Sequence, residues 1–311
     1  MGCLVIGGAG FIGSHLVDRL LADGEFVDVV DDLSTGSLAN LADARAVAKN
    51  VTDALHHTGD HAGLKIHHAD AGSPDLDSLF AMRRPEIVYH LAAVPRRPAG
   101  PADLTGALTR TLNVLEAAHA HGVAKVVATV PATAVYGVPA ARDLPLKERP
   151  LEPRGVRGVV ARAVVDLLDV YRSSAAIEFT ALALASVYGP RQRPADGVVA
   201  AFLHAAAERT TPVITGDGRQ TRDFVFVDDV VDALARAGRR GSGLVVNIGT
   251  GTQTPVRDLW RTVAGAAGGA SSSGPARRDE LARFALSPVR ARIHLGWSPW
   301  TTLDDGLALC R

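Results

Sequence analysis

Lysine is scarce in this chain of 311 residues: only four of its 33 basic residues are lysines, and none follows Lys147. Acidic residues also number 33, so the formal net charge is zero, and we expect no attraction to nucleic acid or to an anionic membrane. The two cysteines, Cys3 and Cys310, stand at opposite ends of the sequence, which suits neither a disulfide framework nor a metal site. These absences predict a reduced, cytoplasmic protein with a small-molecule substrate.

Long apolar runs are also missing, although 47% of the residues are hydrophobic. No run approaches the roughly 18 residues needed to cross a bilayer, so we expect a soluble protein without a membrane partner. The residues before the first apolar segment do not show the pattern of an export signal, so we expect a protein that is not exported. The histidine group lacks the helical spacing of a zinc site, and we predict no metal; its members are His56, His57, His61, His67 and His68.

Apolar segments alternate with helix-like segments through most of the chain. Strand-like runs occur at 3–6, 26–30, 87–91, 123–130, 179–185 and 244–248. This alternation predicts βαβ units and an α/β fold with a doubly wound parallel sheet. We expect a dinucleotide-binding domain over residues 1–180, with the sheet completed by about 224–250. Residues 181–223 and 251–311 are expected to form a smaller substrate-binding subdomain.

The first predicted strand runs into a glycine-rich turn, Gly7-Gly8-Ala9-Gly10-Phe11-Ile12-Gly13. Glycines permit a tight turn and a close approach of the backbone to a pyrophosphate, while the N–H groups at the following helix start attract negative charge. Asp31 follows at the end of the second predicted strand, where a carboxylate accepts hydrogen bonds from ribose hydroxyls. The pattern predicts NAD or NADP, and Asp31 with Asp32 favours NAD because both would repel a 2′-phosphate.

Together with later segments, this turn resembles the extended short-chain dehydrogenase/reductases, a group that includes UDP-glucose 4-epimerases and nucleotide-sugar dehydratases. The resemblance covers almost the whole chain. It is carried by the glycine turn, Asp31 to Gly36, His90 to Ala93, Asn113 to Ala118, Val135-Tyr136-Gly137, Val187 to Gln192, Gly216 to Val230 and Leu295-Gly296-Trp297. It implies that the cofactor contacts Gly7, Gly10, Phe11, Ile12, Gly13, Asp31, Asp32, Ser34, Thr35, Gly36, Asp70, Ala71, Leu91, Ala92, Ala93 and Val130.

The catalytic positions depart from the family pattern. The family uses a serine or threonine, a tyrosine, a lysine and a supporting asparagine, which here align with Ala132, Arg157, Ala161 and Ala107. No Tyr-x-x-x-Lys sequence exists anywhere in the chain, so the usual acid catalyst is missing. Thr133 and Arg157 are weak substitutes. Thr133 would point away from the Ala132 side in an extended strand, and Arg157 stays protonated, so it can stabilise an oxyanion but hardly donate a proton.

Substrate-side positions are altered as well. The arginine and asparagine that precede Val-Tyr-Gly-Pro in the family are Ala183 and Ser186 here, which removes contacts expected for a nucleotide-sugar. The resemblance leaves Ser186, Tyr188 and Arg222 as candidate substrate residues. Arg222 keeps the family's phosphate-binding position, and the resemblance makes Arg277 a second candidate for phosphate binding. For Arg222, an ion pair with Asp223 or Asp228 is an equally good interpretation.

These losses favour a reductase over an epimerase, because epimerisation needs a base that removes and returns a proton. Our leading hypothesis is an NAD(P)H-dependent ketoreductase of a polycyclic phenolic ketone, such as an aromatic polyketide in antibiotic biosynthesis. The substrate's own phenol would replace the missing acid, as in the atypical angucyclinone ketoreductases that this chain resembles in its loss of the tetrad. The alternatives are a nucleotide-sugar epimerase or dehydratase, and a non-catalytic NAD-binding scaffold or sensor.

The segments 111–121 and 161–171 resemble the two-helix face through which members of this group commonly pair. Ala163, Val164, Leu167 and Leu168 leave the second segment apolar. A homodimer is therefore expected from the resemblance.

Overall fold

The computed structural model describes residues 2–55, 63–95, 100–265, 269–276 and 280–311. Seven strands form one parallel sheet in the order β11-β6-β5-β4-β1-β2-β3. These strands are β1 (Gly2–Ile6), β2 (Phe26–Asp31), β3 (Leu64–His68), β4 (Ile87–His90), β5 (Lys125–Pro131), β6 (Glu178–Leu184) and β11 (Leu244–Ile248). The predicted α/β fold with a doubly wound parallel sheet is confirmed.

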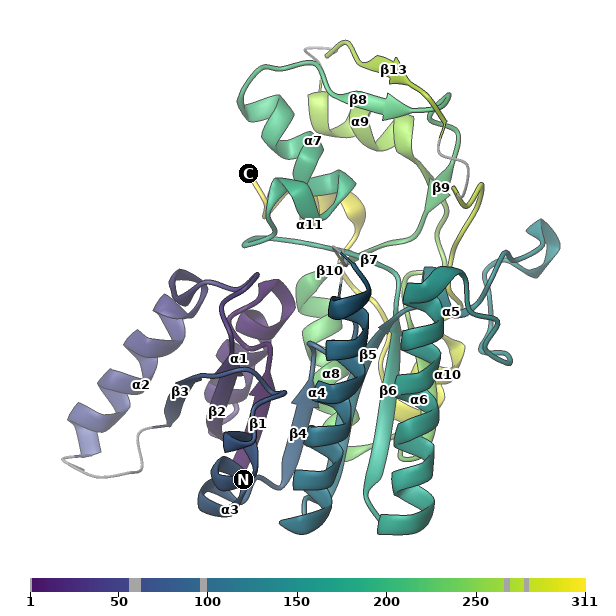
Figure 1. Cartoon of the computed structure of the whole chain (residues 1–311). Coiled ribbons are helices and arrows are strands. Elements are labelled where there is room, and N and C mark those ends of the chain that lie inside the picture. Colours follow the sequence, from purple (N-terminus) through teal and green to yellow (C-terminus); the bar gives the residue numbers. More distant parts are fainter. Residues whose placement is uncertain (1, 56–62, 96–99, 266–268, 277–279) are drawn as a thin grey trace.

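Helices cover both faces of this sheet, as Figure 1 shows. One face carries α1 (Phe11–Ala22), α2 (Ala42–Leu55), α8 (Val227–Arg239) and α10 (Val289–Leu295). The other carries α3 (Asp75–Arg83), α4 (Pro101–Ala120) and α6 (Gly155–Ala175). Side chains along a strand alternate between the faces, so Cys3 and Val5 join the core on one side and Leu4 and Ile6 the core on the other.

Most of the remaining elements lie above the carboxyl ends of the sheet strands, in the upper part of Figure 1, whereas the 3-10 turn of residues 38–41 packs against α1 and α2. Three pairs of short strands form there: β10 with β7, β12 with β9, and β13 with β8. Their bounds are β7 (Ser186–Tyr188), β8 (Val213–Thr215), β9 (Thr221–Arg222), β10 (Phe224–Phe226), β12 (Thr254–Pro255) and β13 (Ser272–Gly274). The helices are α5 (Ala132–Val135), α7 (Val198–Ala207), α9 (Val256–Ala264), α11 (Leu303–Ala308) and the 3-10 turns η1 (Leu38–Leu41), η2 (Ala141–Asp143) and η3 (Pro194–Asp196).

Strand β1 lies between β2 and β4, so the chain crosses to opposite sides of β1 in the two halves of the sheet. Ligands of such sheets bind in the crevice outside the carboxyl ends of the strands at this switch point. The fold therefore places the glycine turn after β1 at the centre of a binding crevice.

Two of the four apolar residues that were expected at a dimer face do not lie on the outside of the protein. Val164 and Leu168 of α6 are buried within the chain's own core, and α6 packs beside α4. Outward-facing apolar side chains on these two helices are Leu112, Val156, Val159 and Val170. Pairing through this face stays a prediction. Among the described residues no helix is long and apolar enough to span a bilayer.

Candidate functional site

The glycine turn after β1 leaves no room for side chains. A Cβ on Gly13 would lie 2.1 Å from the carbonyl oxygen of Gly7, and one on Gly8 would lie 2.8 Å from a methyl carbon of Val29. Gly7 itself has a φ of 82°, in the region that favours glycine. Because the turn packs closely against the start of α1 and its glycines carry no side chains, a ligand can contact the backbone there directly.

Helix α1 begins directly at this turn, with Gly10 as its N-cap residue and no side chain capping it. The first N–H groups of a helix have no acceptor within the helix, and its N-terminus carries a partial positive charge. An uncapped, glycine-lined helix start fits the pyrophosphate of a dinucleotide.

Asp31 closes the other side of the turn. Its Oδ2 accepts a hydrogen bond from the Ala9 N–H at 2.8 Å, and its Oδ1 accepts one from the Leu33 N–H at 2.9 Å. Burial raises the pKa of this carboxyl, while the two backbone donors counteract that shift. Each carboxylate oxygen retains a second lone pair for a ribose hydroxyl. Asp31 therefore both fixes the turn and can receive the adenosine ribose, as Gly7 to Gly13 can receive the pyrophosphate.

The other predicted cofactor positions surround the same crevice. Asp32 and Ser34 form a small exposed hydrogen-bonded turn, and Thr35 is also exposed. Gly36 packs against Ala9 and Asp31 so closely that its Cβ would lie 2.9 Å from each. The predicted adenine-side residues follow β3, where Asp70 accepts from the Gly72 N–H and Ala71 is buried. Phe11 is half-buried and packs edge-on against His15, Ala92 lies beside Gly7 of the turn, and Ala93 is fully buried.

A cavity of about 320 Å³ opens at the carboxyl ends of β4, β5 and β6. Its walls combine the predicted cofactor residues Ile12, Leu91 and Val130 with Ser186 of β7, a predicted substrate residue. Further lining residues are Val94, Thr129, Pro131, Thr133, Arg157, Leu184, Ala185, Val187, Gln192, Asp196, Gly197, Val198, Val199 and Phe224. Cofactor-side and substrate-side segments thus meet around one space.

Three of the four altered catalytic positions are fully buried alanines: Ala107, Ala132 and Ala161. Only Arg157 reaches the cavity. Its Nε donates a hydrogen bond to the Pro95 carbonyl oxygen at 2.8 Å. Among the described lining residues there is no tyrosine, lysine or histidine, and the carboxyl among them, Asp196, pairs with Arg193 at 2.7 Å.

Thr133 lies differently from the expectation. Strand β5 ends at Pro131 and the helical turn α5 begins at Ala132, so the alternation of an extended strand does not apply. The turn buries Ala132 and brings Thr133 to the cavity wall. Thr133 therefore offers a hydroxyl to this space although the serine or threonine position itself holds alanine.

Tyr188 does not line the cavity. Its ring is 1% exposed and packs against Phe226, and its hydroxyl is 3.4 Å from the carbonyl oxygens of Thr302 and Leu303. Of the three predicted substrate residues, Ser186 lines the cavity and Tyr188 supports the core beneath α11.

Arg222 forms an ion pair, but its partner is neither Asp223 nor Asp228. Its guanidinium lies 3.1 Å from Glu280 and also donates to the carbonyl oxygens of Thr221 and Leu281. Asp223 instead accepts from Thr250, Gly251 and Leu286. Glu280 lies 58 residues further along the chain, and no sequence pattern links it to Arg222. Arg277, another arginine that the resemblance relates to phosphate binding, lies outside the described residues.

Three further polar residues line the cavity but were not predicted as site residues: Thr129, Gln192 and Asp196. Thr129 stands on β5 and the other two follow β7. The convergence of parallel strands at one sheet edge could have indicated Thr129, whereas the loop that brings Asp196 to the cavity has no recognisable pattern.

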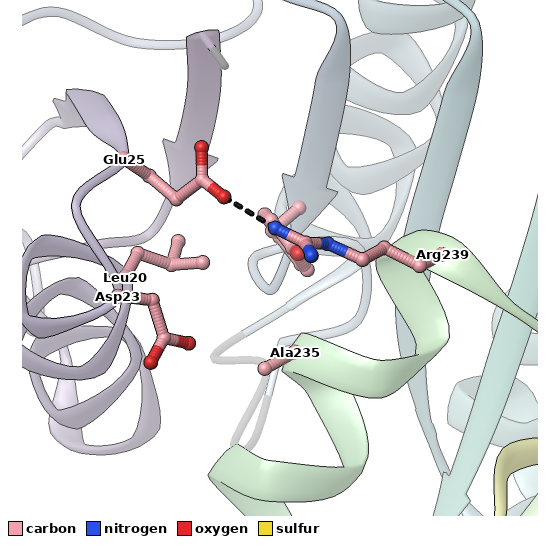
Figure 2. A pocket seen from close by; sticks show the side chains of 6 residues that line it. Leu20, Asp23, Glu25, Ala235 and Arg239 are labelled. Atoms are coloured by element: carbon pink, nitrogen blue, oxygen red, sulfur yellow. Dashed lines mark hydrogen bonds and ion pairs between the residues drawn. The ribbon is translucent and has the colours of Figure 1, made fainter.

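A second cavity, of about 330 Å³, lies at the opposite edge of the sheet. Figure 2 shows Glu25 and Arg239 facing one another across it, joined by an ion pair, with Leu20, Asp23 and Ala235 around them. It lies at the amino ends of the strands and contains none of the predicted cofactor or substrate residues.

The histidine group of the sequence is only partly described. His67 forms a hydrogen bond with the Asp28 carboxylate, and His68 forms one with the Asp32 carbonyl oxygen. His56, His57 and His61 lie outside the described residues.

Comparisons with known proteins agree on one family. Residues 3–249 match the model of the NAD dependent epimerase/dehydratase family. A UDP-glucose 4-epimerase of Mycolicibacterium smegmatis is 42% identical over 99% of this chain and 96% of its own length. The UDP-glucose 4-epimerase of Thermotoga maritima, solved with UDP-glucose, is 32% identical with a TM-score of 0.88, covering 99% of this chain and 97% of that one. That of Thermus thermophilus, solved with NAD, is 31% identical with a TM-score of 0.84 over the same shares.

These relatives overturn the ketoreductase hypothesis. They include UDP-glucose 4-epimerases and UDP-glucuronic acid decarboxylases, and they give no support to a resemblance with angucyclinone ketoreductases or to a role in polyketide or antibiotic biosynthesis. The prediction was wrong because the loss of the four catalytic residues does not by itself imply a different substrate. The preference for NAD over NADP is confirmed. This chain belongs to the NAD dependent epimerase/dehydratase family and is an NAD-dependent enzyme of the extended short-chain dehydrogenase/reductase type.

Proposed function

We propose that this enzyme oxidises and reduces a UDP-sugar with bound NAD, in a reaction of the 4-epimerase type. The observation that carries the proposal is the cavity of about 320 Å³ whose lining includes both Ile12 of the glycine turn and Ser186 of β7. Its support from relatives is the 42% identity to a UDP-glucose 4-epimerase along nearly the whole chain.

NAD, when bound, supplies hydride acceptance and return. The chain's own residues contribute orientation and a dry environment, since Ile12, Leu91, Val130 and Leu184 form apolar parts of the wall. Well-oriented reactants can gain about 7–11 kcal/mol from positioning alone. Binding geometry can therefore support hydride transfer where strong acid catalysis is missing.

Thr133 and Arg157 are the side chains that we assign to the reacting oxygen. The Thr133 hydroxyl can hydrogen-bond to a sugar hydroxyl or carbonyl, and the Arg157 guanidinium can stabilise negative charge that develops on that oxygen. Neither replaces a proton-transferring tyrosine, so the proton of the oxidised hydroxyl passes to solvent water while the hydride goes to NAD⁺, and water returns a proton when the carbonyl is reduced. Losing a general acid or base typically lowers rates by about 10²–10⁴, so we expect slow turnover.

The test is conversion of UDP-galactose to UDP-glucose, followed by chromatography, by the wild-type enzyme and a variant that restores the family's residues. Ala132→Ser, Arg157→Tyr and Ala161→Lys together should raise the rate by about 10² or more. Ala132→Ser alone, a smaller change in the core, should raise it less. Absence of conversion by all three proteins, each shown to be folded and to bind NAD, would contradict the proposal.

A further inference from the structure

A loop that follows β7 lies along one face of α1. Gly189 in this 189–192 loop is next to Phe11, the first residue of α1, because a Cβ on Gly189 would lie 3.6 Å from a ring carbon of Phe11. The carbonyl oxygen of Pro190 lies 3.1 Å from Nε2 of His15, one turn further along the helix. The loop therefore follows α1 from its amino end, where the glycine turn offers its backbone to the pyrophosphate of NAD.

Arg191 continues this alignment with two ion pairs. One nitrogen of its guanidinium lies 2.7 Å from the Asp18 carboxylate, a further turn along α1, and another lies 2.9 Å from Asp43 in α2. The side chains of Arg191 and Asp18 are only 19% and 29% exposed, whereas that of Asp43 is 81% exposed. Water and salt screen an exposed ion pair strongly, so the contact with Asp18 is the one that holds the loop.

The backbone at Arg191 also depends on these contacts. Its φ is 64°, in the left-handed region that costs free energy for a residue with an arginine side chain. Such a conformation persists where the surrounding structure fixes it. Gly189 is closely packed as well, since its Cβ would lie 2.4 Å from a side-chain carbon of Val227 at the start of α8. The 189–192 loop is therefore held in one position between α1 and α8.

The loop ends at the cavity wall. Gln192 lines the cavity, and its Nε2 donates to the carbonyl oxygens of Val187 at 3.1 Å and Asp196 at 3.4 Å. A Cβ on Gly197 would lie 2.8 Å from the same nitrogen, so this amide is closely packed. Because Arg191 directly precedes Gln192, its contact with α1 fixes the position of this part of the wall.

We propose that Arg191 is a positioning residue for the cofactor: it holds the 189–192 loop on α1 and thereby slows the release of NAD. Ile12 of the glycine turn, Val187 and Gln192 line the same cavity, so the loop and the cofactor-binding turn border one space. A loop that has to move before a ligand leaves lowers the dissociation rate, and contacts that hold it in place act mainly on that rate. The inference rests on NAD as cofactor and is independent of the sugar substrate.

The test is the release of NADH, the fluorescent form of the cofactor, from loaded enzyme that is mixed with an excess of NAD⁺. Arg191→Gln removes the charge that pairs with Asp18, and Asp18→Ala removes its partner. We expect each variant to release NADH about tenfold faster than the wild type, which is the effect of losing one charge-assisted hydrogen bond. Because both substitutions break the same contact, the double variant should release NADH no faster than the faster single variant.

Arg19→Gln is the matched control. Arg19 also joins α1 to another element through a buried carboxylate, Asp232 of α8, but near the other end of the helix and outside the cavity. Its release rate should match the wild type.

Unchanged release in either folded single variant would overturn the proposal, and Asp18→Ala alone decides if Arg191→Gln does not fold. Equally fast release in Arg19→Gln would also overturn it, because the effect would then be a general loosening of α1. So would multiplied effects in the double variant, since the two residues would then act separately. Absence of UDP-sugar turnover would leave these rates intact, so the two proposals can fail separately.

Discussion

Glu280 pairs with the side chain that the resemblance assigned to phosphate binding. The Arg222 and Glu280 side chains are both largely buried, and a guanidinium nitrogen of Arg222 lies 3.1 Å from a carboxylate oxygen of Glu280. The two residues belong to segments that are far apart in the sequence. A diphosphate that approached Arg222 would have to share the guanidinium with this carboxylate or displace it. The residue pair therefore bears directly on how tightly a UDP-sugar can bind.

Replacing Glu280 with glutamine should tighten UDP binding. Glu280→Gln keeps the shape of the side chain but removes its charge, so that a phosphate no longer competes with this carboxylate for Arg222. We expect the dissociation constant of UDP to fall about tenfold, measured by calorimetry with NAD present. Weaker binding in Glu280→Gln would mean instead that Glu280 orients Arg222 for the ligand.

His90 gives the fold a dependence on pH. It is buried at the end of β4, where its Nε2 lies 3.1 Å from the Thr111 hydroxyl, and burial lowers its pKa from 6.5 to about 3. The unfolded chain therefore takes up a proton near pH 6.5 that the folded chain refuses until about pH 3. The stability that neutral His90 contributes is complete above pH 6.5 and is lost progressively as pH falls towards 3.

Urea unfolding at pH 7.5 and pH 5 should show this loss. His90→Gln retains an amide that can bond to Thr111 but does not titrate, so its midpoint should shift less between the two pH values than that of the wild type. Equal shifts in both proteins would show that other groups cause the pH dependence.

Helices α4 and α6 each contain a glycine that could be replaced with alanine, but the space around the two glycines differs. Gly106 lies within α4, where a Cβ would meet only the flexible end of Arg110, 3.3 Å away. Gly158 lies in α6, where a Cβ would collide with the backbone of α5. The position of the cavity wall formed by Thr133 and Arg157 depends on this second contact.

We expect Gly106→Ala to stabilise the protein by about 0.5–1 kcal/mol through helix propensity. Gly158→Ala should destabilise it by about 1–3 kcal/mol, because overpacking forces α6 away from α5. Denaturant unfolding of both variants measures the difference. A similar stability change in the two would refute the claim that α6 docks closely on α5.

Elements were easier to predict than the contacts between them. The strand, glycine turn and helix at residues 2–22 are encoded within one short stretch, and the alternation of segments suffices to predict the parallel sheet. The direction of Thr133 could not be predicted, because it depends on where β5 ends and α5 begins. The Arg222 partner was missed because Glu280 reaches it only through the tertiary fold.

At the scale of the whole molecule, the Asp223 carboxylate joins segments that are far apart in the sequence. It is buried and accepts backbone N–H bonds from Thr250, Gly251 and Leu286, which connects the residues after β11 with the C-terminal segment. Both oxygens of a carboxylate can accept hydrogen bonds from these N–H groups. An asparagine amide has only one accepting oxygen, and its NH₂ group would face the remaining donors.

Asp223→Asn should therefore destabilise the protein by about 1–3 kcal/mol. Asp217→Asn is the matched control: Asp217 accepts a single backbone bond, from Arg219, in an exposed turn, so its loss should change stability little. Thermal unfolding of both variants provides the comparison. A melting temperature of Asp223→Asn as high as that of Asp217→Asn would exclude a connecting role for this carboxylate.

The proposed function requires that hydride passes between a UDP-sugar and NAD in the cavity between the glycine turn and β7. The most direct measurement is absorbance at about 340 nm, where reduced nicotinamide absorbs, after rapid mixing of NAD-loaded enzyme with UDP-glucose or UDP-galactose. We predict a slow rise in absorbance that is absent with UDP alone and smaller in Thr133→Val. No rise with either sugar, from enzyme that demonstrably binds both NAD and UDP-glucose, would contradict the account.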